Sequence, residues 1–315
     1  MKRIAIVVPC YNEEEVLPQT IPVLSSVLKG MIDKGKIDSK SFILFVNDGS
    51  RDKTWEIISG AHTESENIYG LNLSKNRGHQ NALVAGLENA ADLCEAIISI
   101  DADLQDDVNA IEQMVDKFLA GADVVFGVRD DRQTDSFFKR FTAVAFYKFM
   151  TALGVNSVNN HADFRLMSQR AVKALLEYEE RNLFLRVLVS NLGFKTDTVY
   201  YARLARTAGE SKYPLKKMLS FAWDGITSFS IKPISLICAL GALITFGSVI
   251  ACICLLIMWF CQSGIPDNAA LMVSLWFIGG VQLISTGIIG QYIGKIYIES
   301  KHRPRYHVME FLKHE

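Results

Sequence analysis

The chain has 315 residues, half of them apolar, and a formal net charge of −1. A chain of this length buries one sizeable core with residues to spare, and its near-neutral balance gives no sign of a partner nucleic acid. Its six cysteines show neither a disulfide framework nor the CxxC spacing of a metal site, so packing is the role we expect for them.

The charge is unevenly distributed along the chain. Residues 1–128 carry 11 Lys and Arg against 20 Asp and Glu, whereas residues 129–232 carry 17 against 10. A basic segment just ahead of an apolar C-terminal region fits contact with anionic head groups or with a phosphate at a surface. A solvated basic face is the alternative.

Short apolar runs alternate with helical patterns through the first 130 residues. The runs cover residues 4–8, 42–46, 69–73, 96–100 and 123–127, and the helical patterns cover about 13–30, 52–61, 78–91 and 107–119. This alternation predicts an α/β sandwich with a mostly parallel sheet. Neither GxGxxG after the first strand nor GxxxxGK[ST] occurs, which removes the dinucleotide fingerprint and the P-loop.

Polar clusters follow four of the predicted strands, at residues 9–13, 47–50, 74–79 and 101–107. Ligands of such sheets bind beyond the carboxyl ends of the strands, so we expect these clusters to share one edge. In extended chain Asp101 and Asp103 project together, with Gln105 behind them. Paired carboxylates repel one another unless a cation lies between them, and Mg²⁺ or Mn²⁺ suits the pair when phosphates and waters complete the coordination. Asp106 and Asp107 fit a plainer role, as the N-cap and first-turn acids of the next helix.

Two segments near the C-terminus have the length and composition of membrane spans. No charged residue lies between Lys232 and Asp267 or between Asp267 and Lys295, which predicts transmembrane helices at about 235–260 and 269–293. Lys and Arg flank the outer ends while residues 261–268 have neither, so both termini are predicted in the cytosol. A GxxxG in the second span predicts close helix contact and an oligomer.

Two amphipathic stretches precede these spans. Apolar residues in 136–152, mostly phenylalanines, and in 213–230 recur at helical spacing, with lysines or arginines beside them. Such helices lie in the membrane interface, although a stripe that packs in the core remains the alternative. Lys139 and Arg140 are the candidates for contact with a lipid phosphate.

Several ordered motifs resemble a known family. The stretches VVPCYNEEEVLP, VNDGSRDKT, LSKNRGHQNALVAGLENA and SIDADLQDD are similar to the catalytic domain of glycosyltransferase family 2, which has a GT-A fold. With HADFRLM at 161–167, RTAGESKYPL at 206–215 and the two apolar segments, the chain resembles the polyprenyl-phosphate glycosyltransferases, the group of dolichyl-phosphate mannose synthase and bactoprenol glucosyltransferases.

The resemblance implies a domain plan and a reaction. A cytosolic GT-A catalytic domain occupies 1–212, a juxtamembrane helix 213–231, the two spans 232–297 and a cytoplasmic tail 298–315. The enzyme is expected to move a sugar, with inversion, from a UDP- or GDP-linked donor to a polyprenyl phosphate at the cytoplasmic membrane, with Mg²⁺ or Mn²⁺ as cofactor.

The resemblance also implies roles for individual residues. The donor is bound by nine residues: Pro9, Tyr11, Glu13, Asp48, Asp101, Ala102, Arg129, Arg206 and Lys212. The metal ligands are Asp101, Asp103 and Gln105. Apart from the resemblance, Lys139 and Arg140 of the amphipathic stretch are expected to contact the lipid phosphate, with Ser211 adding a hydroxyl. Asp163 orients the substrates or removes a proton, and its alternative role is to pair with Arg165. For Asp48 the alternative is a turn cap, and for Arg129 an ordinary surface charge.

Other functions remain open at this stage. A processive polysaccharide synthase has a similar catalytic domain, but it carries QxxRW and more spans, and neither is found here. A non-catalytic membrane partner with a retained transferase fold, and a metal-dependent hydrolase of nucleotide sugars, are the further alternatives.

Overall fold

The computed structural model describes residues 1–129, 161–180, 185–202 and 269–314, with isolated positions between 234 and 253. The chain forms two compact units. The first comprises Met1–Tyr147, Asn156–Tyr213 and Arg303–Glu315, and the second comprises Lys148–Val155 and Pro214–His302.

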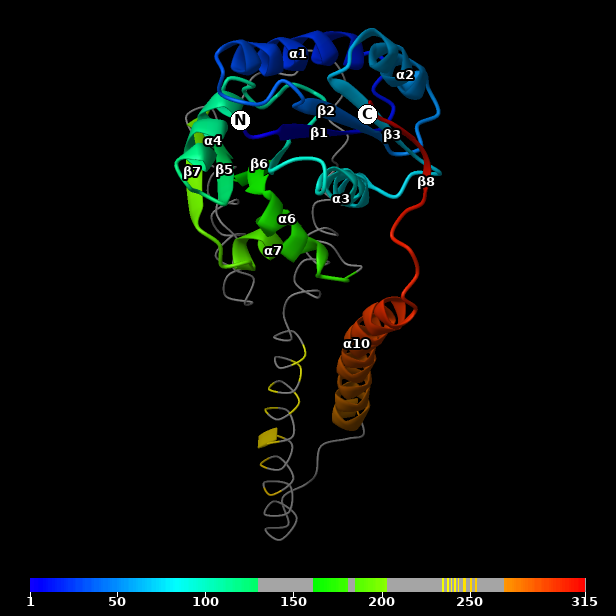
Figure 1. Cartoon of the computed structure of the whole chain (residues 1–315). Helices are drawn as coiled ribbons and strands as arrows, with labels where there is room; N and C mark the ends of the chain where they lie inside the picture. The colour runs from blue at the N-terminus through cyan, green and yellow to red at the C-terminus, as the bar shows by residue number, and fades with distance from the viewer. Residues whose placement is uncertain are drawn as a thin grey trace, which may run out of the picture. The chain divides into compact units, whose positions relative to one another are not determined.

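The first unit is built on one mixed sheet (Figure 1). Its strands are β1 (Ile4–Cys10), β2 (Phe42–Asn47), β3 (Ile68–Leu73), β4 (Ala96–Ser99), β5 (Val124–Arg129), β6 (His161–Ser168), β7 (Thr196–Tyr201) and β8 (Val308–Leu312). They lie in the order β7-β5-β6-β4-β1-β2-β3-β8. Four of the seven pairings are parallel, and the antiparallel ones are β4 with β6, β5 with β6 and β3 with β8. The prediction of an α/β domain with a mostly parallel sheet is confirmed.

Helices cover both faces of this sheet. They are α1 (Leu17–Asp33), α2 (Thr54–Glu64), α3 (His79–Ala90), α4 (Ala110–Leu119), α6 (Gln169–Leu176) and α7 (Leu185–Asn191). In Figure 1, α1 and α2 lie on one side of the sheet and α3 and α6 on the other. Every residue of β1, β2 and β4 is buried, as expected for strands that are covered on both faces.

The strands and helices predicted in the first 130 residues are confirmed, but two helices begin later than the periodicity suggests. The helix predicted from residue 13 begins at Leu17, because residues 13–16 form a turn in which the carbonyl of Glu13 accepts hydrogen bonds from the N–H groups of Val16 (3.1 Å) and Leu17 (3.0 Å). The helix predicted from residue 107 begins at Ala110 with Asn109 as its N-cap. The capping role predicted for Asp106 and the first-turn role predicted for Asp107 are therefore wrong, and the first turn contains Glu112 instead.

The C-terminal segment belongs to the first unit, which the sequence did not indicate. Strand β8 pairs with β3 in antiparallel register, with Glu310 opposite Asn72. The Tyr306 hydroxyl donates a hydrogen bond to Glu88 of α3, and the rings of His314 and His62 stack with centroids 4.1 Å apart. The chain thus returns to the sheet after it leaves the second unit.

The second unit is described mainly through α10 (Ala269–Ser300), a helix of 32 residues. Its described side chains include the large apolar residues Leu271, Leu275, Ile284 and Ile296, each about two-thirds exposed. Some side chains of α10 lie outside the description, and among the described residues no helix combines the length and hydrophobicity of a membrane span.

Candidate active site

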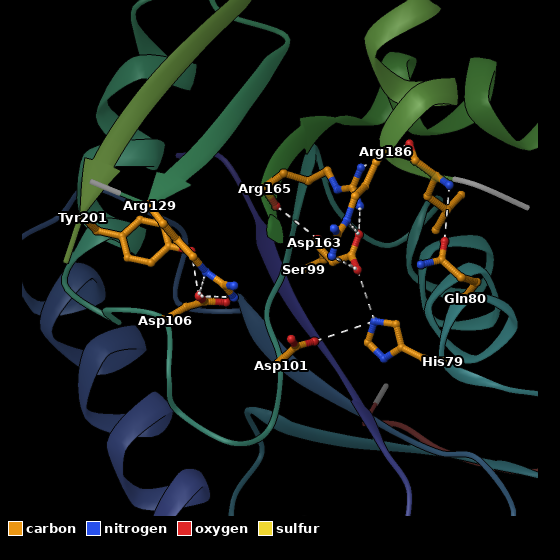
Figure 2. A network of polar contacts seen from close by, with 11 residues as sticks. His79, Gln80, Ser99, Asp101, Asp106, Arg129, Asp163, Arg165, Arg186 and Tyr201 are labelled. Carbon is orange, nitrogen blue, oxygen red and sulfur yellow. Dashed lines mark hydrogen bonds and ion pairs between the residues drawn. The ribbon is translucent and has the colours of Figure 1, made fainter. Parts of the chain in front are cut away.

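The polar clusters predicted after the strands meet at the carboxyl edge of the parallel strands. Strand β6 runs antiparallel to β4 with Ser99 opposite Arg165, so Asp163 precedes this pairing and reaches the edge where the chain leaves β4 towards Asp101. Figure 2 shows the resulting network of polar contacts. Asp101 and Asp163, which are 62 positions apart in the sequence, therefore lie at the same edge.

Asp101 and Asp103 lie in a turn and not in extended chain. Strand β4 ends at Ser99, residues 102 and 103 form a turn, and Leu104 has φ of +51°, a conformation that a leucine rarely adopts. The extended geometry on which we based the carboxylate pair is therefore wrong. The Asp103 carboxylate accepts a hydrogen bond from the N–H of Gln105 at 3.2 Å, which fixes it within the turn.

The Asp101 carboxyl is difficult to ionise where it lies. Its pKa is raised to about 6 because burial and the negative charges of Asp163, Asp106 and Asp103 disfavour its charged form, against the opposing effect of His79. The side chain is still 40% exposed, so a ligand has access to it. A carboxylate in such an acidic environment favours a cation.

His79 lies between the two principal carboxylates. Its Nε2 atom is 3.6 Å from Oδ1 of Asp101 and 3.7 Å from Oδ2 of Asp163 (Figure 2). One ring nitrogen of His79 therefore faces both carboxylates at ion-pair distance. His79 was not among the residues predicted for the site. Its place at the end of the polar run 74–79 was the available signal.

The loop that carries His79 is held by Asp48. The two carboxylate oxygens of Asp48 accept the N–H groups of Arg77 (2.7 Å) and Gly78 (2.9 Å), immediately before α3. Gly49 has φ of +61°, and a Cβ there would lie 2.5 Å from the backbone of Lys75. Asp48 thus holds a loop distant in the sequence and does not cap its own turn, where Oδ1 of Asn47 accepts the N–H of Ser50. Its predicted contact with the nucleotide stays a prediction.

Asp163 is neutralised by two arginines. Its Oδ1 accepts a hydrogen bond from Nη2 of Arg165 at 2.7 Å, and Arg186 donates from Nε and Nη2 to the two oxygens, at 3.3 Å each. Burial favours the neutral acid, but the charges of Arg186, Arg165 and His79 outweigh it and hold the pKa of Asp163 well below its usual value. A carboxylate of this kind positions other groups and is a weak base.

Arg129 forms an ion pair within the protein. Its Nη2 and Nε donate to Oδ1 of Asp106 at 3.0 and 3.2 Å, and the Tyr201 hydroxyl donates to the same oxygen at 2.6 Å. The Asp106 side chain is 1% exposed and that of Arg129 is 29% exposed. The pair ties the loop after β4 to the ends of β5 and β7. The alternative of an ordinary surface charge is excluded, and the contact with a donor diphosphate stays a prediction.

The remaining predicted donor residues lie at the same edge or just beneath it. Pro9 is buried within β1, and Tyr11 follows that strand with 37% of its surface exposed. The Glu13 N–H donates to Oγ1 of Thr54 at 2.8 Å. Ala102 is buried, and its carbonyl accepts the Thr20 hydroxyl at 2.7 Å. Tyr11 is therefore the most accessible of the four.

Five predicted residues lie outside the described part of the chain. They are Lys139, Arg140, Arg206, Ser211 and Lys212. Their assignments to the lipid phosphate and to the donor diphosphate stay predictions.

The carboxylates of the site are oxygen ligands of the kind that Mg²⁺ and Mn²⁺ prefer. Among the described residues, no group of three or more His, Cys, Asp and Glu side chains has the arrangement of a metal site. Mg²⁺ and Mn²⁺ often bind through one or two carboxylates together with substrate phosphates, and the raised pKa of Asp101 marks the place where such a charge is favoured. The carboxylates of this turn would supply part of such an ion's coordination, and waters or substrate phosphates would supply the rest.

Comparison with known proteins identifies the family. The model of "Glycosyl transferase family 2" matches residues 5–176, more than half of the chain. This chain belongs to glycosyltransferase family 2. It is 48% identical over 303 residues to the uncharacterized glycosyltransferase YkoT of Bacillus subtilis, covering 96% of this chain and 90% of the relative. It is 40% identical over 306 residues to the bactoprenol glucosyl transferase of Shigella phage SfV, covering 96% and 97%.

Solved structures are more distant from this family member. Glucosyl-3-phosphoglycerate synthase of Mycobacterium tuberculosis, in complex with Mn²⁺, UDP and glucosyl-3-phosphoglycerate, is 16% identical with a TM-score of 0.41, covering 72% of this chain and 78% of that one. At this identity and TM-score, the similarity says nothing about the residues of the site described above. Family membership rests on the sequence match, and it makes the protein a glycosyltransferase.

Proposed function

We propose that the protein transfers a sugar from a UDP- or GDP-linked donor to a polyprenyl phosphate and thereby produces a polyprenyl-phosphate-linked monosaccharide. The relative from Shigella phage SfV, which is named a bactoprenol glucosyl transferase, supports the acceptor class because its similarity covers 96% of this chain, including the C-terminal region.

One observation carries the proposal on the structural side. Asp163, predicted to orient the substrates or to remove a proton, is paired with Arg165 and Arg186, which hold its pKa well below the usual value. Such a carboxylate is poorly suited to deprotonate a sugar hydroxyl. A phosphomonoester needs no such base, since its second pKa lies near 6 and it is mostly dianionic at neutral pH.

The donor is proposed to bind across the carboxyl edge of the sheet. Tyr11 and Asp48 lie on the nucleotide side, while Arg206 and Lys212 are proposed for the diphosphate because guanidinium and ammonium groups suit phosphate oxygens. Asp101 and Asp103, with Gln105, would hold a divalent ion, which supplies positive charge for the departing nucleoside diphosphate. Asp163, ionised at all working pH values, orients His79 and Arg186 around the reacting sugar.

Displacement is proposed to occur in one step. The acceptor phosphate oxygen forms the new bond to the anomeric carbon while the bond to the nucleoside diphosphate breaks on the opposite face, which inverts the configuration. Positioning and charge stabilisation then supply the rate enhancement.

The fold supports the proposed membrane topology. The first unit contains residues on both sides of the predicted spans, because β8 pairs with β3 after the chain has passed through residues 214–302. Any chain that leaves one domain, crosses a bilayer and pairs again with that domain must cross an even number of times. Two spans, at about 235–260 and 269–293, meet this condition and match the predicted placement of both termini in the cytosol. The exposed apolar side chains of α10 favour a lipid environment there.

The test is a reconstitution with defined substrates. The detergent-purified full chain is incubated with a polyprenyl phosphate, a panel of UDP- and GDP-sugars, and Mg²⁺ or Mn²⁺, and the lipids are analysed by mass spectrometry. We expect one monosaccharide added to the lipid phosphate. A long glycan would indicate the processive synthase, free sugar the hydrolase, and no turnover of any donor the non-catalytic partner.

A further inference from the structure

Arg186 is a cation of the site to which sequence reasoning assigned no role. It lies in α7 and contacts Asp163 through two hydrogen bonds of 3.3 Å, longer than the 2.7 Å bond that Arg165 makes to the same carboxylate. Its side chain is 39% exposed, whereas that of Arg165 is 1% exposed. Of the two arginines on Asp163, only Arg186 is accessible to a ligand.

The local charge favours an anion beside Arg186. Arg186 adds a second guanidinium, with part of its surface exposed, to a carboxylate that the buried Arg165 already pairs. On the far side of His79, Asp101 and Asp103 place two carboxylates in one turn, with Oδ1 of Asp101 3.6 Å from Nε2 of His79, and paired carboxylates favour a cation. The network therefore has a cation-binding end at Asp101 and an anion-binding end at Arg186, with His79 between them (Figure 2).

The residue before Arg186 is held in place by two side chains from other elements. Gln80 of α3 accepts the N–H of Leu185 at 3.2 Å, and Nη1 of Arg165 donates to the Leu185 carbonyl at 3.2 Å. Both backbone groups of Leu185 are thus fixed by residues next to His79 and Asp163. This anchoring sets where the Arg186 side chain begins, as expected for a residue that must meet a ligand in a fixed geometry.

We propose that Arg186 binds the phosphate of the acceptor. A guanidinium offers five N–H donors in a planar fork that matches phosphate oxygens, so one group contacts both Asp163 and a phosphomonoester. The acceptor then lies at the anion-binding end, and the diphosphate leaves at the Asp101 end, on opposite sides of the sugar, as an in-line displacement requires. This inference rests on the proposed function and adds a residue to the predicted lipid-phosphate contacts Lys139 and Arg140.

The experiment compares Arg186→Met with wild type in steady-state assays with a short-chain polyprenyl phosphate. Loss of a charge-assisted contact predicts an increase in the acceptor KM of about 10- to 100-fold. We expect the donor KM to change less than about threefold. At saturating acceptor, kcat should stay within about threefold of the wild-type value. Arg186→Lys, which keeps the charge but loses the fork, is expected to fall between the two.

The matched control is Lys173→Met, which removes an exposed cation of α6 that pairs with Asp92 at the surface. We expect it to keep both KM values. An unchanged acceptor KM in Arg186→Met and Arg186→Lys, or an increase confined to the donor KM, would overturn the inference. If Arg186→Met does not fold, Arg186→Lys alone decides, because an acceptor KM equal to that of wild type contradicts a fork on phosphate. Failure of wild type to glycosylate any polyprenyl phosphate would instead contradict the proposed function.

Discussion

Arg129→Met separates two roles of one arginine. In the structure Arg129 pairs with Asp106, whose carboxylate is almost completely buried and also accepts the Tyr201 hydroxyl. The family resemblance implies a contact between Arg129 and the donor diphosphate. The substitution keeps most of the side-chain volume and removes the charge, so it reports on which contact matters more.

The expected loss of stability follows from the burial of the pair. Removal of one partner of a buried ion pair costs about 3–5 kcal/mol. Arg129 retains 29% exposure and Tyr201 still donates to Asp106, so we expect about 2–3 kcal/mol here. For a domain of this size 1 kcal/mol corresponds to roughly 2–4 °C, which predicts a decrease in Tm of about 4–12 °C.

The assay is thermal unfolding of the detergent-purified full chain, with donor KM measured in parallel. Lys34→Met is the control, because Lys34 pairs with Glu112 at the surface and such pairs contribute about 0–1 kcal/mol. In the double variant with Asp106→Asn, the two losses should combine to less than their sum. An unchanged Tm in Arg129→Met together with a donor KM increased more than about tenfold would refute the assignment of Arg129 to Asp106.

Three further outcomes follow from the structure. Gly49→Ala should cost more than about 1 kcal/mol, since its φ of +61° and the Lys75 backbone at 2.5 Å leave no room for Cβ, whereas Gly30→Ala in α1, with nothing within 4 Å, should not lower Tm. Asp163→Asn should lower Tm strongly, by the equivalent of about 3–5 kcal/mol, because it leaves the fully buried Arg165 without its anion, and a Tm equal to that of wild type would contradict the pairing. Binding of Mn²⁺ to the free protein, followed by calorimetry, should weaken about tenfold from pH 7 to pH 5, because the Asp101 pKa of about 6 makes protons compete with the ion below that pH; affinity independent of pH would exclude Asp101 as a ligand.

The sequence predicted the regular elements well and their junctions less well. Strands such as β1 and β4 are recognisable because both faces are buried, which makes each a continuous apolar run. The turn at Asp101–Asp103 and the turn before α1 also make hydrogen bonds to helices distant in the sequence, and local periodicity does not predict these bonds. The Thr20 hydroxyl of α1 donates to the Ala102 carbonyl, and the Glu13 N–H donates to Thr54 of α2.

The candidate site was also predicted only in part. The motifs indicated which strand ends carry function, but a side chain's partner depends on sheet order. Arg165 and Arg186 meet on Asp163 because β6 pairs with β4 and α7 contacts α3 through Gln80, and neither pairing is visible in the spacing of residues. Strand β8 was missed because five residues after a long apolar segment give no periodic signal of their own.

The central claim is that carboxylates after β4 support transfer of a sugar to a lipid phosphate with a divalent ion. Its most direct test is the yield of glycosylated lipid from wild type and Asp103→Ala, with Mg²⁺ or Mn²⁺ and with excess chelator. We expect product from wild type with metal only, and none from an Asp103→Ala protein whose Tm shows that it is folded. Full activity of that variant, or of wild type in chelator, would contradict the account.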